Sequence, residues 1–260
     1  MKLTMEQYIT NPMQSPILTA TMRESMRNSY IKKFNALLLR EHGVINYFLY
    51  KDEEHNKYYA YFKIPSETIE RFYYDTVIEF SADQNIAEAG TNLFKYNVRF
   101  YSNDPSFVYS YAYVFSRKGL FINAFANKMS QKALRDAAKE KNPANQVGYV
   151  KTIYFAYLFM KLRSFNDLDK FKAQASVLNL DNLVGTVMPA DQKLGEREDA
   201  QARLSRKKKV AQDKAKREEQ RQKEKNSDLA VRYTKKTGAG NIKTTSTVKT
   251  TKIVKKTKRK

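Results

Sequence analysis

The Lys and Arg side chains are the residues of this chain whose number and spacing point most clearly to a chemistry. Residues 191–260 hold 24 Lys and Arg against 9 Asp and Glu, whereas residues 1–190 hold 24 against 18. A dense run of cations gains affinity for a polyanion because each neutralised phosphate releases bound counterions. The sequence therefore predicts contact with DNA or another acidic partner through the last cations of the chain, which are Lys243, Lys249, Lys252, Lys255, Lys256, Lys258, Arg259 and Lys260.

The composition of the basic segments limits what they can recognise. Residues 226–260 hold 11 Lys and Arg against one acid, with threonines between the lysines and Tyr233 as the only aromatic residue. Such a segment neutralises backbone charge and tolerates any base sequence. A tail that only solvates the protein is the alternative. The run Arg206–Lys209 fits a spacer helix as well as a binding element, because pairs such as Asp213/Arg217 and Glu219/Lys223 support an exposed helix.

Residues with the spacing of a catalytic, cofactor or metal site are scarce. The absence of cysteine excludes disulfides, zinc–thiolate sites and thiol catalysis. The two histidines, His42 and His55, belong to no HExxH pattern, and no GxSxG, GxGxxG or GxxxxGK[ST] motif is present. The run Asp52–His55 is predicted to be a solvated hairpin tip in preference to a metal site. We expect no enzyme and no cofactor, although folding can bring carboxylates together into an undetected site.

The sequence does not predict a membrane protein. The most apolar run, Gly148–Leu162, contains Lys151 and is shorter than the roughly 20 residues that a spanning helix needs. Met1–Gln14 lacks the apolar stretch of a signal peptide. We expect a protein made in the cytoplasm that makes no membrane contact.

The distribution of aromatic residues predicts where the chain folds. Of 33 Tyr and Phe residues, 32 lie between Tyr8 and Phe171, and a segment without large apolar side chains cannot bury a core. The sequence therefore predicts four parts: an extended arm at 1–20, a folded domain at 21–190, a charged and solvent-exposed helix at 191–225, and a disordered Lys/Thr-rich tail at 226–260.

The periodicity of the folded part predicts an α+β fold with an N-terminal helix and a mostly antiparallel, aromatic-rich sheet with packed helices. Helical spacing predicts helices over Thr21–Arg40, Leu120–Lys139 and Tyr149–Arg163. Aromatic and β-branched runs predict strands over Ile45–Tyr50, Lys57–Ile64, Asp75–Phe80, Asn92–Tyr101 and Phe107–Phe115.

The most regular of these expected strands is Phe107–Phe115. Strict alternation places five aromatic residues on one face, Phe107, Tyr109, Tyr111, Tyr113 and Phe115. The other face carries small or aliphatic residues, so we expect burial on both sides, in the core or at a subunit interface. The alternative is an aromatic face on which single-stranded bases stack.

Four blocks of the chain carry a resemblance to known proteins: MRESMRNSYIKKFNALLLRE (22–41), KYYAYFKIPSETIERFYYDTVIEF (57–80), NLFKYNVRFYSNDPSFVYSYAYVF (92–115) and GYVKTIYFAYLFMKL (148–162). Together they resemble uncharacterised virion structural proteins of tailed bacteriophages that infect Gram-positive hosts. The resemblance covers most of residues 20–190 and transfers no functional residue.

The resemblance implies a non-enzymatic component of the virion, assembled in the host cytoplasm and located in the head, the neck or the head–tail connector. Its partners would be other virion proteins, further copies of itself in a homo-oligomer, and DNA bound non-specifically through the basic tail. A standalone host protein that binds nucleic acid or the ribosome is the alternative.

Overall fold

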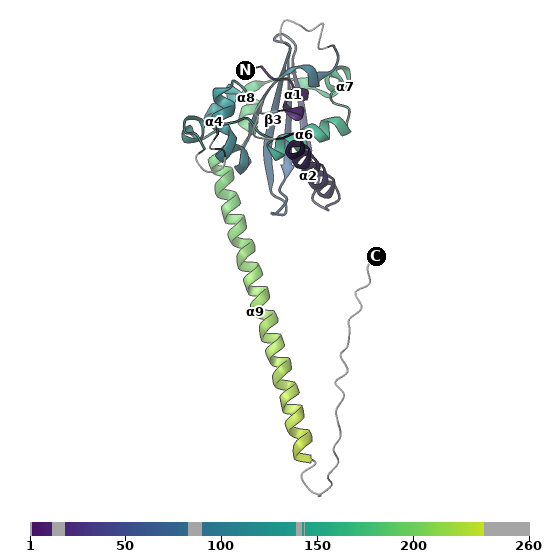
Figure 1. The fold of residues 1–260 in the computed structure, drawn as a ribbon, viewed down its shortest axis with the longest axis vertical. Helices are drawn as coiled ribbons and strands as arrows, with labels where there is room; N and C mark the ends of the chain where they lie inside the picture. Colours follow the sequence, from purple (N-terminus) through teal and green to yellow (C-terminus); the bar gives the residue numbers. More distant parts are fainter. Residues whose placement is uncertain (1, 12–18, 83–89, 139–141, 143, 237–260) are drawn as a thin grey trace. The chain divides into compact units, whose positions relative to one another are not determined.

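The computed structural model describes residues 2–11, 19–82, 90–138, 142 and 144–236, and it describes side chains as far as Lys225 (Figure 1). The chain divides into two compact units, Met1–Arg203 and Leu204–Lys260. The first unit contains the sheet and most of the helices. The second unit continues the long helix α9, which runs from Ala190 to Lys236.

A five-stranded sheet in the order β4-β3-β2-β1-β5 forms the centre of the first unit. The strands are β1 Asn46–Asp52, β2 Lys57–Pro65, β3 Tyr73–Ser81, β4 Asn97–Ser102 and β5 Ser176–Val177. Neighbouring strands are antiparallel, except that β5 runs parallel to β1. The predicted α+β fold with a mostly antiparallel, aromatic-rich sheet is confirmed.

The predicted hairpin forms, and its turn shows why. Asp52 pairs with Lys57 at the end of the β1–β2 ladder. Asn56 adopts a positive φ of 48°, which asparagine tolerates better than most residues. The Asp52 carboxylate accepts a hydrogen bond from the backbone N–H of His55 at 3.2 Å, so this acid closes the turn.

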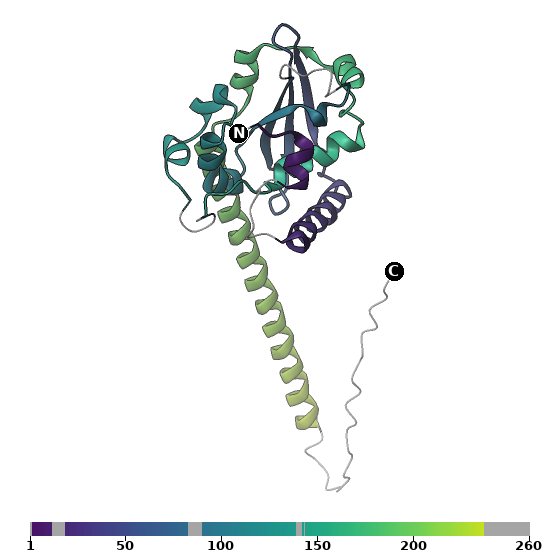
Figure 2. The same cartoon turned by 45° about the horizontal axis from the view of Figure 1, so that its top comes forward.

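One face of the sheet is covered by three helices, α1 Met5–Thr10, α2 Ala20–Leu38 and α6 Lys151–Leu162. Figure 2 shows α1 and α2 in purple on this side of the strands. Aromatic rings make the contacts: Tyr8 of α1 lies 4.8 Å from Phe100 of β4, and Phe159 of α6 lies 6.0 Å from Phe62 of β2. Helix α2 packs on α6 through Phe34 and Phe155.

The opposite face of the sheet is covered at β4 by the 3-10 turn η3, Asn123–Lys128. Adjacent strand residues point to opposite faces, so Tyr101 lies on this side while Phe100 lies on the other. The Tyr101 ring stacks on Phe125 with centroids 4.8 Å apart, and its hydroxyl donates to the carbonyls of Lys128 and Met188. The sheet is therefore the middle layer of three.

The prediction of a strand at Phe107–Phe115 is wrong, because this segment is helical. A π-helical turn, η2 Phe107–Tyr111, continues into α4 Ala112–Arg117. Asp104 starts it: its carboxylate accepts from the N–H of Ser106 at 2.6 Å, and its carbonyl accepts from Val108 at 3.0 Å. Gly119, with φ of 70°, ends it in the left-handed conformation typical of helix C-termini.

Three other expectations differ from the structure. The segment expected to be an extended arm contains α1, whose capping box joins Thr4 and Gln7 and whose Met5 and Tyr8 are buried. The expected helix Leu120–Lys139 is replaced by η3 and the short α5, Gln131–Arg135. The start of the expected strand Asn92–Tyr101 is a 3-10 turn, η1 Leu93–Lys95.

The remaining helices of the first unit are α7 Leu168–Gln174 and α8 Leu180–Thr186. The exposed basic helix is confirmed as α9, although it continues to Lys236, beyond the expected end at 225. Residues 237–260 lie outside the described part of the chain. The predicted domain boundary at residue 190 stays a prediction, whereas the first compact unit ends at Arg203.

Candidate nucleic-acid interface

In the described part of the second unit, the charged side chains lie on a solvent-exposed helix. Residues 204–225 contain ten Lys and Arg, four Asp and Glu, and no aromatic residue. Every side chain from Ser205 to Lys225 is exposed. The segment is rich in Ala, Gln, Glu, Lys and Arg, which favour helix even without packing. Its positive charge is therefore accessible to a ligand along the whole described length.

The spacing of the cations gathers them on one side of this helix. With 3.6 residues per turn, steps of three and four residues align the residues that we call the α9 basic stripe: Arg206, Lys207, Lys214, Arg217, Arg221 and Lys225. Val210 lies within the stripe, and Asp213 and Glu224 lie at its edge. At about 1.5 Å per residue, the stripe is about 28 Å long, which matches several phosphates of a nucleic acid backbone.

Of the four acids in residues 204–225, three border the stripe and one lies on a different side of the helix. Glu219 lies away from the stripe and pairs with Lys223 at 2.8 Å, whereas Glu218, seven residues before Lys225, lies at the edge of the stripe. The other expected pair, Asp213 and Arg217, does not form an ion pair among the side chains that the structure describes. The stripe consequently keeps a net positive charge, and an exposed pair such as Glu219–Lys223 contributes only a few tenths of a kcal/mol to the helix.

The first turns of α9 belong to the first unit and are anchored there. Ala190 and Leu194 are buried. The ammonium of Lys193 lies 4.7 Å from the centre of the Phe72 ring, and Nε of Arg197 donates to the Tyr74 hydroxyl at 3.0 Å. These contacts fix where α9 begins.

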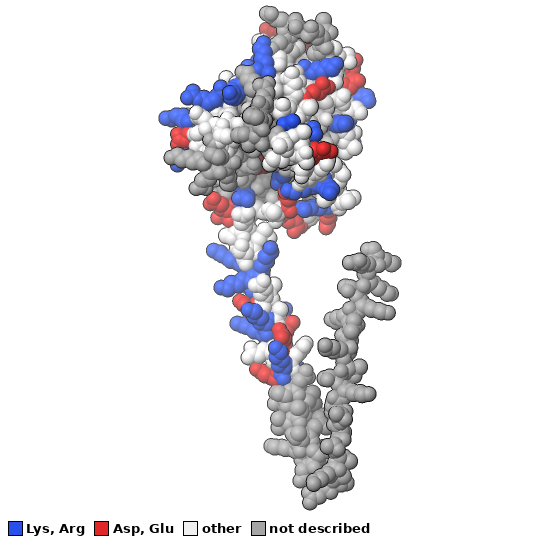
Figure 3. Space-filling model, viewed as in Figure 1, with Lys and Arg blue, Asp and Glu red and all other residues white. Residues whose placement is uncertain are grey.

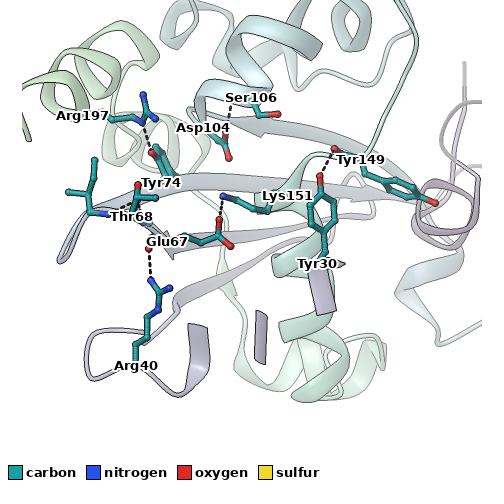
Figure 4. Close-up of polar contacts among 12 residues, drawn as sticks. Tyr30, Arg40, Glu67, Thr68, Tyr74, Asp104, Ser106, Tyr149, Lys151 and Arg197 are labelled. Atoms are coloured by element: carbon teal, nitrogen blue, oxygen red, sulfur yellow. Dashed lines mark hydrogen bonds and ion pairs between the residues drawn. The ribbon is translucent and has the colours of Figure 1, made fainter. Parts of the chain in front are cut away.

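A polar cluster beside this anchor is the strongest candidate for a catalytic site (Figure 4). Lys151 Nζ lies 2.7 Å from a carboxylate oxygen of Glu67, and Arg40 donates to the Glu67 carbonyl at 2.6 Å. Burial raises the pKa of the Asp104 carboxyl, and the positive charges of Lys151 and Arg197 oppose that rise.

The contacts of this cluster are structural. Each one joins segments far apart in the chain: the turn after α2, the loop after β2, strand β3, the start of α6 and the first turns of α9. Among the described residues, no buried side-chain polar atom lacks a hydrogen-bond partner. The cluster ties these segments of the first unit together.

A hollow of about 430 Å³ near Glu67 is the second place where a hydrolytic site could be sought. His42 lies 3.0 Å from the Glu70 carboxylate at its rim. The candidate nucleophile would be Ser66, but its hydroxyl oxygen already accepts from the N–H groups of Thr68 and Ile69 at 3.3 Å. It holds the turn and makes no hydrogen bond to the histidine, so the nucleophile–base contact that such chemistry needs is not formed.

The sequence-predicted site residues are only partly placed. Lys243 and the other predicted cations of the tail lie outside the described residues. At the hairpin tip, His55 Nδ1 lies 3.0 Å from Asp52, and the described residues contain no group of three or more potential metal ligands. None of the described helices is both long and apolar enough to cross a bilayer.

The sequence carried a signal for the α9 basic stripe, because its cations recur at three- and four-residue steps. It carried none for Lys193 and Arg197, whose roles depend on Phe72 and Tyr74 in a distant strand and loop.

Comparisons with protein-family models, with curated proteins and with solved structures find no match. The functional argument therefore rests on the residues of this chain.

Proposed function

We propose that this is a non-enzymatic structural protein of a bacteriophage virion, located in the head, the neck or the head–tail connector, whose basic C-terminal segment binds DNA. The single observation that carries the nucleic-acid part is the exposed surface of α9, with ten cations against four acids in residues 204–225. The virion part rests on the resemblance of the four sequence blocks.

The chemistry of the stripe favours binding without base recognition. Its groups are Lys and Arg on a single exposed helix, with no aromatic ring between them on which a base could stack. Contacts of this kind go to phosphates, and they position a protein without reading sequence. Packaged DNA, which presents phosphates regardless of sequence, is a partner of the required chemistry.

The first unit supplies the assembly module in this proposal. Its aromatic core spans both faces of the sheet, and its surface leaves apolar side chains such as Leu39 and Val44 exposed, at 88% and 63%. Subunit interfaces bury apolar side chains of this kind at their centre. Light scattering on the purified protein should report a homo-oligomer. A strict monomer at high concentration would favour the alternative, a standalone binder of nucleic acid.

The DNA-binding role is tested by neutralising the stripe. Changing all six stripe cations to glutamine keeps helix-forming residues and should weaken binding to random-sequence duplex DNA by at least about tenfold at low salt. A matched control changes six exposed lysines of the first unit to glutamine: Lys2, Lys32, Lys33, Lys95, Lys161 and Lys170. Equal losses in the two variants would contradict a role for the stripe.

A further inference from the structure

The helix Phe107–Arg117 sorts its aromatic residues between the core and the surface. Phe107 and Phe115 are fully buried and pack on each other with centroids 5.3 Å apart. Tyr109 is 50% exposed, and Tyr113, one helical turn further on, is half-buried. A strand would have placed all four rings on one face. The helix instead turns two tyrosine rings outward.

The outward tyrosines lie in line with a cation. Tyr109, Tyr113 and Arg117 follow one another at four-residue spacing, which keeps them on one side of the helix. The Arg117 guanidinium lies over the Tyr113 ring, 5.8 Å from its centre. This contact holds a positive group at the end of the aromatic row.

The surroundings of this row are positively charged. Between Asp104 and Asp136 the sequence has five cations and no acid. Lys132 and Arg135 are exposed on α5, which packs against α4. Among the residues described, Arg117, Lys132 and Arg135 form no ion pair with a carboxylate. Figure 3 shows some of the Lys and Arg side chains on the left of the first unit, near the place where Figure 1 labels α4, with an acidic side chain beside them.

We propose that this Tyr–Arg surface, formed by Tyr109, Tyr113, Arg117, Lys132 and Arg135, binds single-stranded nucleic acid. Exposed rings beside cations are the two components of single-strand recognition: bases stack on the rings while Arg and Lys contact the backbone. A duplex keeps its bases stacked inside and offers only its phosphates to such a surface. The rings therefore confer a preference for single strands.

This inference goes beyond the proposed function. The α9 basic stripe has no aromatic residue and offers contacts to phosphates of any nucleic acid. The Tyr–Arg surface lies in the first compact unit and would discriminate between strand states. The two sites use different residues, so an experiment can disprove nucleic-acid binding at one of them without affecting the other.

The test compares two ligands on the full chain. Binding is measured by fluorescence anisotropy to labelled oligothymidylate of about 20 nucleotides, longer than the roughly 4–16 nucleotides that a single-strand site covers, and to a duplex of equal length. The Tyr109→Ala/Tyr113→Ala variant should lose roughly tenfold or more in affinity for the single strand. Its affinity for the duplex should change less than twofold.

Three control variants separate stacking from other effects. Tyr109→Phe/Tyr113→Phe keeps the rings and should bind the single strand like the parent protein. Phe48→Ala removes an aromatic side chain that is 45% exposed elsewhere on the sheet, and it should not change single-strand affinity. Lys132→Gln/Arg135→Gln should weaken single-strand binding more than Lys32→Gln/Lys33→Gln, a pair that is also exposed.

A folded Tyr109→Ala/Tyr113→Ala variant, checked by its unchanged melting temperature, that retains single-strand affinity would overturn the inference. An equal loss for single strand and duplex would also overturn it, because it would show a purely electrostatic surface. If polyglutamate competed with the oligothymidylate as well as unlabelled oligothymidylate does, the surface would be a site for an acidic protein instead. Loss of duplex binding in the stripe variant, with single-strand preference retained, would support both sites independently.

Discussion

At the scale of residues, tyrosine hydroxyls hold distant segments together. The Tyr8 hydroxyl donates to the carbonyl of Gly148 at 3.1 Å and accepts from the N–H of Val150 at 3.0 Å. In return, the Tyr149 hydroxyl donates to the carbonyl of Ile9 at 2.8 Å. The sequence predicted an aromatic core but not these bonds, because the partners lie about 140 residues apart. They explain why residues 5–10 form a docked helix.

Gly148 is predicted to be intolerant of a side chain. A Cβ there would lie 2.8 Å from the Cε1 and hydroxyl oxygen of Tyr111, so Gly148→Ala should destabilise the first unit by about 1–3 kcal/mol through overpacking. Gly195→Ala is the matched control, since nothing lies within 4 Å of its Cβ position in α9. That change should be neutral or stabilise by up to about 1 kcal/mol. Urea denaturation of both variants checks the prediction, and equal stabilities would contradict it.

Buried tyrosines predict a loss of stability in alkali. Burial raises the pKa of Tyr30 and of Tyr154 to about 12, whereas an unfolded tyrosine has a pKa of about 10. The folded state holds these protons more tightly, so their contribution is fully present below pH 10 and is lost as pH rises from about 10 to 12. The urea midpoint should fall across that window, and less steeply in Tyr30→Phe. A midpoint independent of pH up to about 12 would refute this reading.

At the scale of elements, the sequence predicted most of the sheet and the two long packed helices, and it failed where two periodicities coincide. Aromatic residues at every second position from Phe107 to Phe115 satisfy a strand. They also satisfy a helix, because positions 107, 111 and 115 share a helical face. Asp104 and Gly119 favour the helix over the strand, because Asp104 caps the start of the segment and Gly119 ends it. The alternation of aromatic residues, taken alone, favours a strand and takes no account of the helix-starting and helix-ending residues on either side of the segment.

The start of α9 is predicted to contribute to the stability of the first unit. Lys193→Ala/Arg197→Ala removes the cation–π contact with Phe72 and the hydrogen bond to Tyr74, and should cost about 1–2 kcal/mol. Lys208→Ala/Lys209→Ala removes two exposed cations from the same helix and should change stability by less than about 0.5 kcal/mol. Thermal unfolding of the first unit compares the two double variants. Equal changes in stability would show that the contacts of Lys193 and Arg197 do not stabilise the first unit.

At the scale of the whole molecule, charge and aromatic content divide the chain between a first unit with an aromatic core and a second unit whose side chains are exposed over the described stretch from Ser205 to Lys225. The first unit, ending at Arg203, buries most of its aromatic residues, on both faces of one sheet. In the second unit, every side chain from Ser205 to Lys225 is exposed. Composition predicted this division because a core requires large apolar side chains. The first turns of α9 are anchored in the first unit by contacts with Phe72 and Tyr74, and this compact unit ends at Arg203.

Limited proteolysis should reveal the same division. Trypsin is expected to cut first within the exposed cations from Arg206 to Lys225 and to leave a resistant fragment that ends near Arg203, because exposed segments without tertiary contacts open most easily. Mass spectrometry of the fragments gives the boundary. A stable fragment that extends through Lys225 in the isolated protein would show that this part of α9 is protected.

The salt dependence of duplex binding tests the central claim most directly. If each of the six cations of the α9 basic stripe neutralises one phosphate, they contribute about −5 to the slope of log K against log salt concentration, at about −0.9 per contact. Changing all six to glutamine should make the slope of the full chain shallower by about that amount. An unchanged slope in the folded variant would contradict the claim that α9 binds nucleic acid.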